Sequence, residues 1–565
     1  MKRLIVLVPF MMCAVMSFSQ NNYYVSPTGN NSNTGSVSSP WQTIQYALNH
    51  LAGSDVLNVM PGTYNEKITV PIDNITIKND SSTLPVIDAT GITTQNPVVY
   101  IGNRSNVLIE GLELRNNIQN DAQGILIEGS GANITVKNCV IHDIHFSSNP
   151  NAAVSETTNA QGIIVFGTGS TTPMTNLKLQ NNTLYNCRLG YSEGIAVNGN
   201  VDGFEISNNT VYDLTNIGID VIGHEGTSPS AANDQARNGI VRMNTVHHCV
   251  SAYATSGGIY IDGAKRMVVE KNTSYRNGYG IEVGCEKTGA TTDSIIIRNN
   301  VFYDNEISGI AMGGFDYPSG SGKVTRALIR NNTCFSNDYS NSGVGELYLT
   351  YSENSTIENN IFYTSSQNQL AYAELTQPAL YFDYNVVYSA GGNAGTSVDW
   401  NGTFYTSFSA FISGSSTNSH AVFGDPLLAS TSLNAPDFHI AANSPAVNGG
   451  NPSTTVLSDE TDYFNELRVE QNVIDCGADE YGSTTAGMTE WMQQTMSVYP
   501  NPATSDVTVL MDSPIEHYGI YSLAGEKMLS GSGNQPIDVS GLATGLYFIR
   551  VSDGTTVSTV KFQKR

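Results

Sequence analysis

Apolar and polar positions alternate with strand-like spacing along most of this chain, and the alternation is organised as a repeat. Its first mark is a glycine followed by isoleucine, one variable residue and a second apolar residue. Successive side chains of a strand point to opposite faces, so the apolar pair should face inward and the variable residue outward. The repeat occurs as Gly162-Ile-Ile-Val, Gly194-Ile-Ala-Val, Gly218-Ile-Asp-Val, Gly258-Ile-Tyr-Ile, Gly280-Ile-Glu-Val and Gly309-Ile-Ala-Met.

Asparagine marks a second recurring position, and a third short apolar run often precedes it. The asparagine runs are Asn181-Asn-Thr-Leu-Tyr, Asn208-Asn-Thr-Val-Tyr, Asn244-Thr-Val-His-His, Asn272-Thr-Ser-Tyr, Asn299-Asn-Val-Phe-Tyr, Asn331-Asn-Thr-Cys-Phe and Asn359-Asn-Ile-Phe-Tyr. Repeats of about 22 to 40 residues, with three short strands per turn, predict an all-β fold, a right-handed parallel β-helix. Asparagine tolerates the left-handed conformation at tight bends, and its stacked side chains should hydrogen-bond from coil to coil.

The two ends of the predicted solenoid differ from its middle. Apolar residues at helical spacing in 41–51 predict a short helix that plugs the first coil within an entry segment, 20–64. The motifs Tyr24-Val-Ser-Pro-Thr-Gly-Asn, Trp41-Gln-Thr-Ile and Pro61-Gly-Thr-Tyr resemble the entry segment of many extracellular bacterial β-helix proteins, among them polysaccharide lyases and glycosidases. The β-helix is predicted to span 65–481, with irregular last coils from about residue 365.

Charge and the N-terminus point to an exported protein. The formal net charge is −24, which argues against non-specific binding to nucleic acid or to an anionic membrane. Residues 1–19 combine a basic start with a short apolar core and small residues, the pattern of a secretory signal peptide. No later apolar run is long enough for a transmembrane helix. The six cysteines beyond the signal lack zinc-site spacing, and we expect buried thiols, with an occasional disulfide as the alternative.

The pattern changes again after a Gly/Ser/Thr-rich stretch, 482–490, which predicts a flexible linker. Residues 491–565 contain Tyr499-Pro-Asn-Pro and Gly541-Leu-Ala-Thr-Gly-Leu-Tyr-Phe-Ile and end in Lys564-Arg565. They resemble the C-terminal sorting domain of type IX secretion in Bacteroidetes. The resemblance implies a small β-sandwich that is recognised by the type IX machinery, and a secreted or cell-surface protein.

Candidate chemistry follows from the outward positions. Asp220, Tyr260 and Glu282 occupy the variable position of successive repeats, so they should form one outward column on coils about 4.8 Å apart. Asp262 lies two residues beyond Tyr260 on the same face, one coil from Glu282. Two carboxylates so arranged suit glycoside hydrolysis, with either retention or inversion.

Other polar residues follow these strands on the side where the longest connections fall, and long loops on one side of a solenoid make a groove wall. Asp220 could orient Asp262 or bind a sugar hydroxyl, as could His224 and Glu225. Arg237 could reach an anionic group of a substrate. Tyr253, Phe315 and Tyr317 could form platforms for sugar rings. The predicted substrate-binding residues are His224, Glu225, Arg237, Tyr260, Lys265, Glu286 and Asp316.

The segment Gly258-Ile-Tyr-Ile-Asp262, followed by Ile281-Glu-Val, resembles the catalytic region of β-helix glycosidases of the β-xylosidase type. The resemblance implies that Asp262 is the nucleophile and Glu282 the acid/base. The tryptophan that usually follows the aspartate is replaced by Gly263.

Two alternatives stay open at this point. A polysaccharide lyase acting on a uronate polymer would use Lys265, Arg266 or Arg237 as its base, with Ca²⁺ as an optional cation. The calcium-binding aspartate cluster of related pectate lyases is missing, however, and Asp220 stands alone. A non-catalytic glycan-binding or adhesion protein would keep the groove without needing the carboxylates. A glycoside hydrolase needs no cofactor, and the metal ligands, if any, are unknown from the sequence.

Overall fold

The computed structural model describes residues 20–456, 460–469, 473–483, 497–510, 515–522, 527–533, 536–552 and 557–565. The predicted signal peptide, 1–19, lies outside these residues, as does most of the predicted linker, 482–490. The chain divides into two compact units, residues 1–484 and 485–565.

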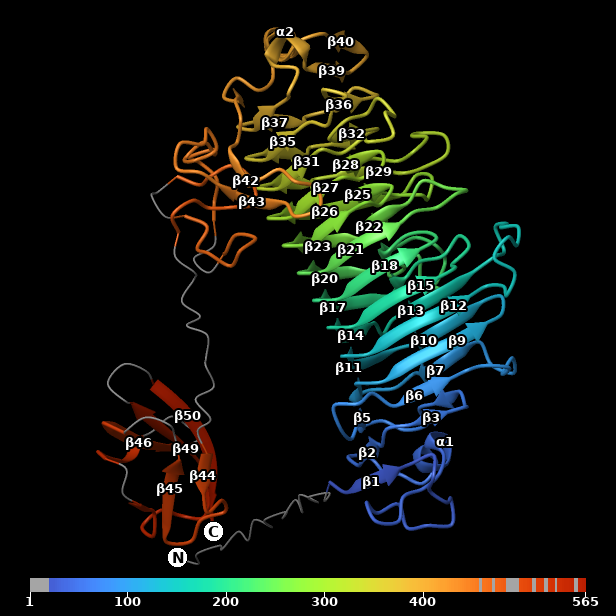
Figure 1. Ribbon diagram of the computed structural model, residues 1–565, viewed down its shortest axis with the longest axis vertical. Coiled ribbons are helices and arrows are strands. Elements are labelled where there is room, and N and C mark those ends of the chain that lie inside the picture. The colour runs from blue at the N-terminus through green and yellow to red at the C-terminus, as the bar shows by residue number, and fades with distance from the viewer. Residues whose placement is uncertain are drawn as a thin grey trace, which may run out of the picture. The chain divides into compact units, whose positions relative to one another are not determined.

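The first unit is a solenoid in which successive coils each add a strand to three long, almost entirely parallel sheets (Figure 1). The first sheet has β29 (Lys323–Thr325) and β33 (Ser352–Glu353) beside its main path. That path is β1 (Asn22–Val25), β2 (Val56–Val59), β5 (Ile75–Asn79), β8 (Val107–Glu110), β11 (Gly131–Lys137), β14 (Met174–Gln180), β17 (Val201–Ser207), β20 (Arg237–Arg242), β23 (Lys265–Glu270), β26 (Thr291–Arg298), β30 (Leu328–Arg330), β34 (Thr356–Glu358) and β37 (Tyr381–Asp383).

The second sheet carries the glycine repeats, and its last pair of strands is antiparallel. It comprises β4 (Ile68–Thr69), β7 (Pro97–Gly102), β10 (Ala122–Glu128), β13 (Ala160–Gly167), β16 (Ile195–Gly199), β19 (Ile219–Ile222), β22 (Gly257–Asp262), β25 (Tyr279–Gly284), β28 (Ser308–Met312), β32 (Leu347–Leu349), β36 (Gln369–Ala373), β39 (Ser397–Trp400) and β40 (Thr403–Tyr405).

The third sheet carries the asparagine runs. It comprises β3 (Thr63–Tyr64), β6 (Val86–Asp88), β9 (Glu113–Ile118), β12 (Val140–His145), β15 (Thr183–Cys187), β18 (Thr210–Leu214), β21 (Thr245–Cys249), β24 (Thr273–Tyr275), β27 (Val301–Tyr303), β31 (Thr333–Phe335), β35 (Ile361–Tyr363), β38 (Val386–Tyr388) and β41 (Val422–Phe423). One apolar core runs inside the three sheets along the solenoid. All six cysteines of the described residues are buried and free.

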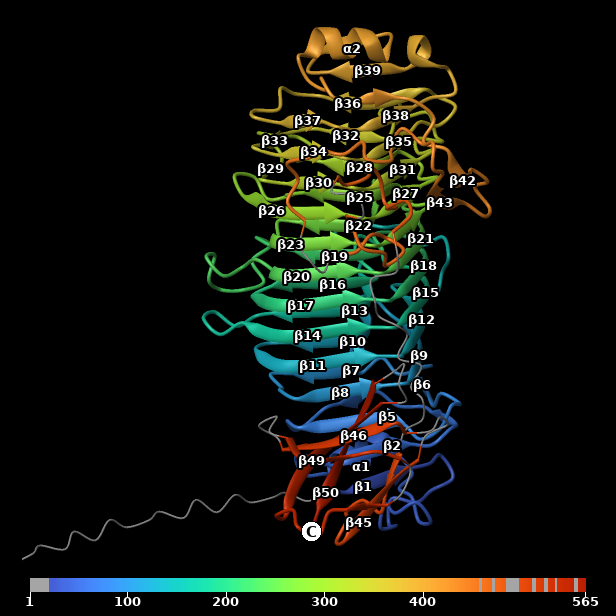
Figure 2. The ribbon, with the colours of Figure 1, turned by 90° about the vertical axis from the view of Figure 1, so that its left-hand side faces the viewer.

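Helices close both ends of the solenoid (Figure 2). The predicted N-terminal helix is present but short: α1 spans Ile44–Leu48, and its apolar side chains are buried against the first coils. The Glu66 carboxylate accepts the N–H groups of Ile44 and Gln45 at 2.8 and 2.9 Å, which caps this helix. At the other end, η1 (Asn393–Gly395) and α2 (Phe408–Ser415) follow, and Phe411 of α2 packs on Trp400 of β39.

The two asparagines of each Asn-Asn pair have different tasks. The first takes the left-handed conformation, as at Asn208 with φ of 56°, but Met243 and Lys271 do the same in other coils. The second is a buried asparagine in every coil from Asn182 to Asn385, because its side chain hydrogen-bonds to the next coil. This asparagine ladder runs through Asn182, Asn209, Asn244, Asn272, Asn300, Asn332, Asn360 and Asn385.

The chain then folds back along the solenoid, starting with the hairpin β42 (Leu428–Ser430) and β43 (Asp437–Ile440). The carboxylate of buried Glu460 pairs with Arg298 at 2.6 Å and with Arg330 at 2.8 Å, side chains from strands of the first sheet. The amide of Asn331 donates to the Asp475 carbonyl at 2.8 Å. The irregular C-terminal part is therefore packed against the coils.

The second unit is a small antiparallel β structure of two sheets that share one apolar core. Its strands are β44 (Ser497–Tyr499), β45 (Asp506–Leu510), β46 (His517–Ser522), β47 (Lys527–Gly531), β48 (Ile537–Asp538), β49 (Gly545–Ser552) and β50 (Val557–Lys564). None of the helices in the described parts of either unit has the length and apolar character needed to span a bilayer.

We expect the buried asparagine of a pair to matter far more than its neighbour. Asn209→Gly should lower the free energy of unfolding by about 2–4 kcal/mol, because the Asn182 amide and the Leu179 carbonyl lose their buried partners. Asn208→Gly, an exposed position that is already left-handed, should cost under about 0.5 kcal/mol. Denaturant unfolding followed by circular dichroism compares the two, and equal losses would contradict the ladder.

Candidate active site

A column of outward side chains crosses the middle coils of the second sheet. The strand register pairs Asp220 with Tyr260, and Tyr260 with Glu282, in the order that the sequence repeat predicts. The column continues to Ala311 and Tyr348 in the next two coils. The flanking side chains of Ile259, Ile261, Ile281 and Val283 point into the core and are fully buried.

Glycine gives this face a second outward column that simple alternation does not predict. The glycine of each repeat points inward: a Cβ on Gly218 would lie 2.5 Å from Cγ1 of Val246. The residue before the glycine is thereby turned outward, and a Cβ on Gly257 would lie 3.4 Å from Cβ of Glu282. Glu193 and Tyr279 hold the same place in their coils, and both line the cavities described next.

Two adjoining cavities lie on this face, together named the groove. The first, the acidic cavity, has a volume of about 660 Å³. Its carboxyl groups belong to Glu156, Glu193, Asp220, Glu225, Asp262 and Glu286. The second, the aromatic cavity, has a volume of about 380 Å³ and is lined by Glu282, Glu286, Tyr260, Tyr279, Phe315 and Tyr348, among others. Ile217 and Glu286 belong to both cavities, so the two are continuous.

Glu282 is held in its protonated form at neutral pH. Burial raises its pKa to about 8, and the charge of Glu286 adds to the shift. Burial also raises the pKa of Glu193 to about 8, with further contributions from Glu286 and Glu225. An acid that keeps its proton at neutral pH can donate it to a leaving group.

Asp220 and Asp262 lie deeper, with 3% and 4% of their surface exposed. Burial and then neighbouring carboxylates raise the pKa of both well above the usual range. Asp262 differs in one contact, because its Oδ1 accepts the Glu286 N–H at 2.8 Å, and this bond favours the ionised form. Oδ1 of Asp220 is buried and has no hydrogen-bond partner.

The spacing of Asp262 and Glu282 follows from the strand register. Asp262 pairs with Gly284, two residues beyond Glu282 on the adjacent strand. A strand separation of about 4.8 Å and a rise of about 6.6 Å for two residues put their Cα atoms about 8 Å apart. Side chains of this length can bring their carboxyl groups into either of the two arrangements used in glycoside hydrolysis.

The basic residues expected near the site lie elsewhere. Arg237 and Lys265 are opposite each other on the neighbouring strands β20 and β23 of the first sheet, around the corner of the solenoid. Neither residue lines a cavity of the groove. Arg237 is bound to the Asp202 carboxylate at 2.9 Å. Arg266 donates to the Asn238 side chain at 2.7 Å. The corner turns at Gly263 and Ala264, which sends the side chains that follow Asp262 to a different face.

The structure brings Tyr260, Glu225 and Glu286 into the groove, as expected from the sequence, but not His224 or Asp316. His224 lies in the connection after β19 and lines neither cavity. Asp316 lies in the loop after β28, where its carbonyl accepts the Gly320 N–H at 2.7 Å. Its neighbour Phe315 is 69% exposed and lines the aromatic cavity.

The other two predicted platforms are engaged within the protein. The Tyr253 hydroxyl donates to the Thr215 carbonyl at 2.9 Å, and the Tyr317 ring stacks on Tyr351 with centroids 4.0 Å apart. Sequence reasoning missed Tyr348, which the repeat register could have found, and Tyr279 and Glu193, which required knowing that the glycine turns inward.

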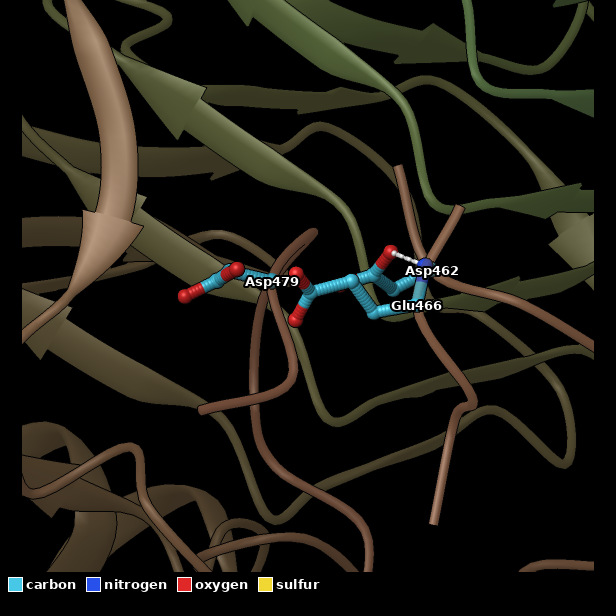
Figure 3. Close-up of side chains that lie close together, drawn as sticks. All are labelled: Asp462, Glu466 and Asp479. Carbon is cyan, nitrogen blue, oxygen red and sulfur yellow. Dashed lines mark hydrogen bonds between the residues drawn. The ribbon is translucent and has the colours of Figure 1, made fainter. Parts of the chain in front are cut away.

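A separate acidic group ties down the folded-back segment (Figure 3). Ligand atoms of Asp462, Glu466 and Asp479 lie within 4.8 Å of one another, close enough to hold a cation. Both oxygens of Asp462 already accept backbone N–H groups, from Glu466 at 2.8 Å and Glu480 at 2.9 Å. These bonds show that the group stabilises the folded-back segment. Among the described residues, this is the one group of three acidic residues with ligand atoms this close. The carboxyl groups of the groove therefore lie farther apart.

Comparison with known families agrees with both units. Models of the "Right handed beta helix region" match residues 72–235 and 193–320, which confirms the predicted fold and its handedness. A model of a protein of unknown function matches 27–83. The "Secretion system C-terminal sorting domain" matches 497–565. The sorting domain therefore indicates that the chain is exported by type IX secretion to the cell surface or the extracellular space.

Individual proteins are also similar. The uncharacterized protein YwoF of Bacillus subtilis (strain 168) is 31% identical over 444 residues, which are 75% of this chain and 91% of YwoF. A complex of XylC with xylose has 12% identity and a TM-score of 0.46, over 72% of this chain and 87% of XylC. Pectate lyase Pel9A has 15% identity and a TM-score of 0.41, over 82% of this chain and 96% of that enzyme. These two structural likenesses assign no activity to the chain.

We expect the groove acids to make stability fall with rising pH. Folded Glu193, with a pKa raised from 4.5 to about 8, keeps a proton that the unfolded chain loses above pH 4.5. Its contribution is complete below pH 4.5 and is lost as pH rises through about 8. Glu193→Gln should therefore raise the melting temperature at about pH 9 by about 2 °C or more, with little change at about pH 4.

Calorimetric melting at the two pH values measures this difference. Asp80→Asn removes an exposed carboxyl group after β5, outside the groove, and is the control. A stabilisation of Glu193→Gln that is the same at both pH values would contradict the raised pKa.

Proposed function

The chain belongs to the same family of right-handed β-helix proteins as YwoF of Bacillus subtilis, and on that premise we propose that it is a secreted glycoside hydrolase. One observation carries the proposal. Glu282 keeps its proton at neutral pH in a groove where Asp262, one coil away, is anchored by the Glu286 amide. Glycoside hydrolysis needs one carboxylic acid and one carboxylate at such a distance.

In this mechanism the sugar lies across strands β22 and β25, with the glycosidic oxygen beside Glu282. Glu282 transfers its proton to that oxygen as the bond between the oxygen and the anomeric carbon breaks. Asp262 acts once it has lost its proton, which the hydrogen bond from the Glu286 N–H favours. Its carboxylate then either attacks the anomeric carbon, giving a glycosyl-enzyme that water hydrolyses, or takes a proton from the attacking water. Oδ1 of Asp220, which is buried and has no hydrogen-bond partner within the protein, accepts a hydrogen bond from the bound sugar.

A lyase would need a base and a cationic group beside the uronate carboxylate. Arg237 is bound to Asp202, and neither Lys265 nor Arg266 lines the groove. The seven carboxyl groups that do line it would repel a polyuronate. These contacts favour hydrolysis over elimination.

We expect Glu282→Gln and Asp262→Asn each to lower kcat by about 10²–10⁴-fold, because each removes one of the two groups that move protons or charge. The measurement is release of reducing ends from a panel of glycans by the full chain, together with the absorbance of unsaturated uronates. Glu110→Gln, a surface residue paired with Lys137, is the control and should keep full activity.

Melting temperatures of the variants separate loss of catalysis from loss of folding. Full activity in either groove variant would exclude the assignment. Growth of the unsaturated-uronate absorbance without reducing ends from hydrolysis would make the enzyme a lyase.

The pH dependence tests the role of Glu282 separately. Because the acid must be protonated, kcat should fall as pH rises through about 8, the pKa to which burial raises Glu282. A pH profile of kcat with a chosen active glycan checks this. If the residual kcat of Glu282→Gln still falls through about pH 8 as in the native chain, another group is the acid.

A further inference from the structure

The groove holds far more carboxyl groups than glycoside hydrolysis requires. Seven line its two cavities, where a hydrolase uses two. The described residues that line these cavities include no lysine, arginine or histidine. Burial raises the pKa of Glu193 and Glu286, and repulsion from neighbouring carboxylates, with no cation between them, adds to both shifts. A groove that maintains this repulsion suits a ligand that relieves it.

Buried Asp220 gives a second, independent indication. Its Oδ1 has no hydrogen-bond partner although only 3% of the residue is exposed, and the residue lines the acidic cavity. A buried oxygen without a donor is costly, so a donor from the ligand is expected there. Glu193 and Glu225 contribute to the same cavity, Glu225 from its exposed edge. An ammonium group supplies several donors and a positive charge at once.

The aromatic cavity suits the same ligand. Tyr279 and Tyr348 lie with ring centroids 6.4 Å apart, and exposed Phe315 lies in the same cavity. Aromatic faces attract cations and bury the apolar faces of sugar rings.

We propose that the groove binds a glycan that carries protonated amino groups, such as an oligomer of glucosamine. Glu225 and Glu193 hold its ammonium groups, with Glu193 releasing its proton to solvent as the amine binds, and Oδ1 of Asp220 accepts an N–H from the ligand. This inference rests on the proposed function, because it takes the groove as the place where the glycan lies. A uronate bridged by Ca²⁺ is the competing ligand, but the groove carboxylates do not gather three ligand atoms within 4.8 Å, as the Asp462 group does.

The test is calorimetric titration of the full chain with a β-1,4-linked glucosamine hexamer and with its fully N-acetylated counterpart. The amine should bind about tenfold tighter or more at roughly 0.02 M salt, and this preference should shrink at roughly 0.5 M salt. Glu193→Gln/Glu225→Gln should lose most of the preference. The control Asp80→Asn/Glu110→Gln removes the same number of carboxyl groups from the N-terminal coils and should keep the preference. If the groove variant fails to fold, the native chain tests the inference by itself: a preference for the amine that does not shrink at high salt would contradict it.

Chromatography of the ligands after titration reads cleavage in the same samples. Tight, salt-sensitive binding of the amine without cleavage would support this inference and would show that this ligand is bound but not hydrolysed, so the two proposals can fail separately. Cleavage of the N-acetylated hexamer, with no preference for the amine, would overturn this inference alone. A galacturonate hexamer that binds tighter than the amine when Ca²⁺ is added would overturn it as well.

Discussion

Hydrogen bonding from coil to coil is the constraint on which this structure depends. Each buried asparagine of the ladder holds the next coil through its side chain and its backbone N–H, at 2.9–3.0 Å in most steps. A slip of one residue would reverse the two faces of every strand. With the register held, side chains that are 20 or more residues apart in the chain, such as Asp220, Tyr260 and Glu282, lie on neighbouring strands.

The same repetition creates the groove. Inward glycines occupy the limited space beside Val246 and Leu214 in the core, and this turns the preceding residue outward. Where that residue is Glu193 or Tyr279, the face gains an acid or a ring. Where it is Gly257, space remains beside Glu282. The groove is therefore formed by different side chains at equivalent positions of successive repeats, whose strands stay in register from coil to coil.

The clustered carboxyl groups lower stability, and other parts of the fold offset this. Burial first, and then the charges of neighbouring carboxylates, make Glu193, Asp220 and Asp262 each hold a proton more firmly than in water. The cores of the coils, the asparagine ladder and the folded-back segment with its Glu460 pairs to Arg298 and Arg330 supply rigidity around them. Strain of this kind is common where a protein binds or reacts.

Short repeats and strand alternation in the sequence predicted the solenoid and the outward column of Asp220, Tyr260 and Glu282. Helical spacing predicted the closing helix near Ile44, and a resemblance to a known family predicted the sorting domain. Tertiary structure alone decided which polar residues meet. Arg237 and Lys265 each follow a groove strand in the chain, but each begins a strand of the first sheet, beyond the corner of its coil. Glu193 enters the groove because Gly194 faces inward. It also decided that Glu460, more than 100 residues beyond the coils it contacts, pairs with Arg330. Alternation describes a straight strand, and it carries no information about where the chain bends.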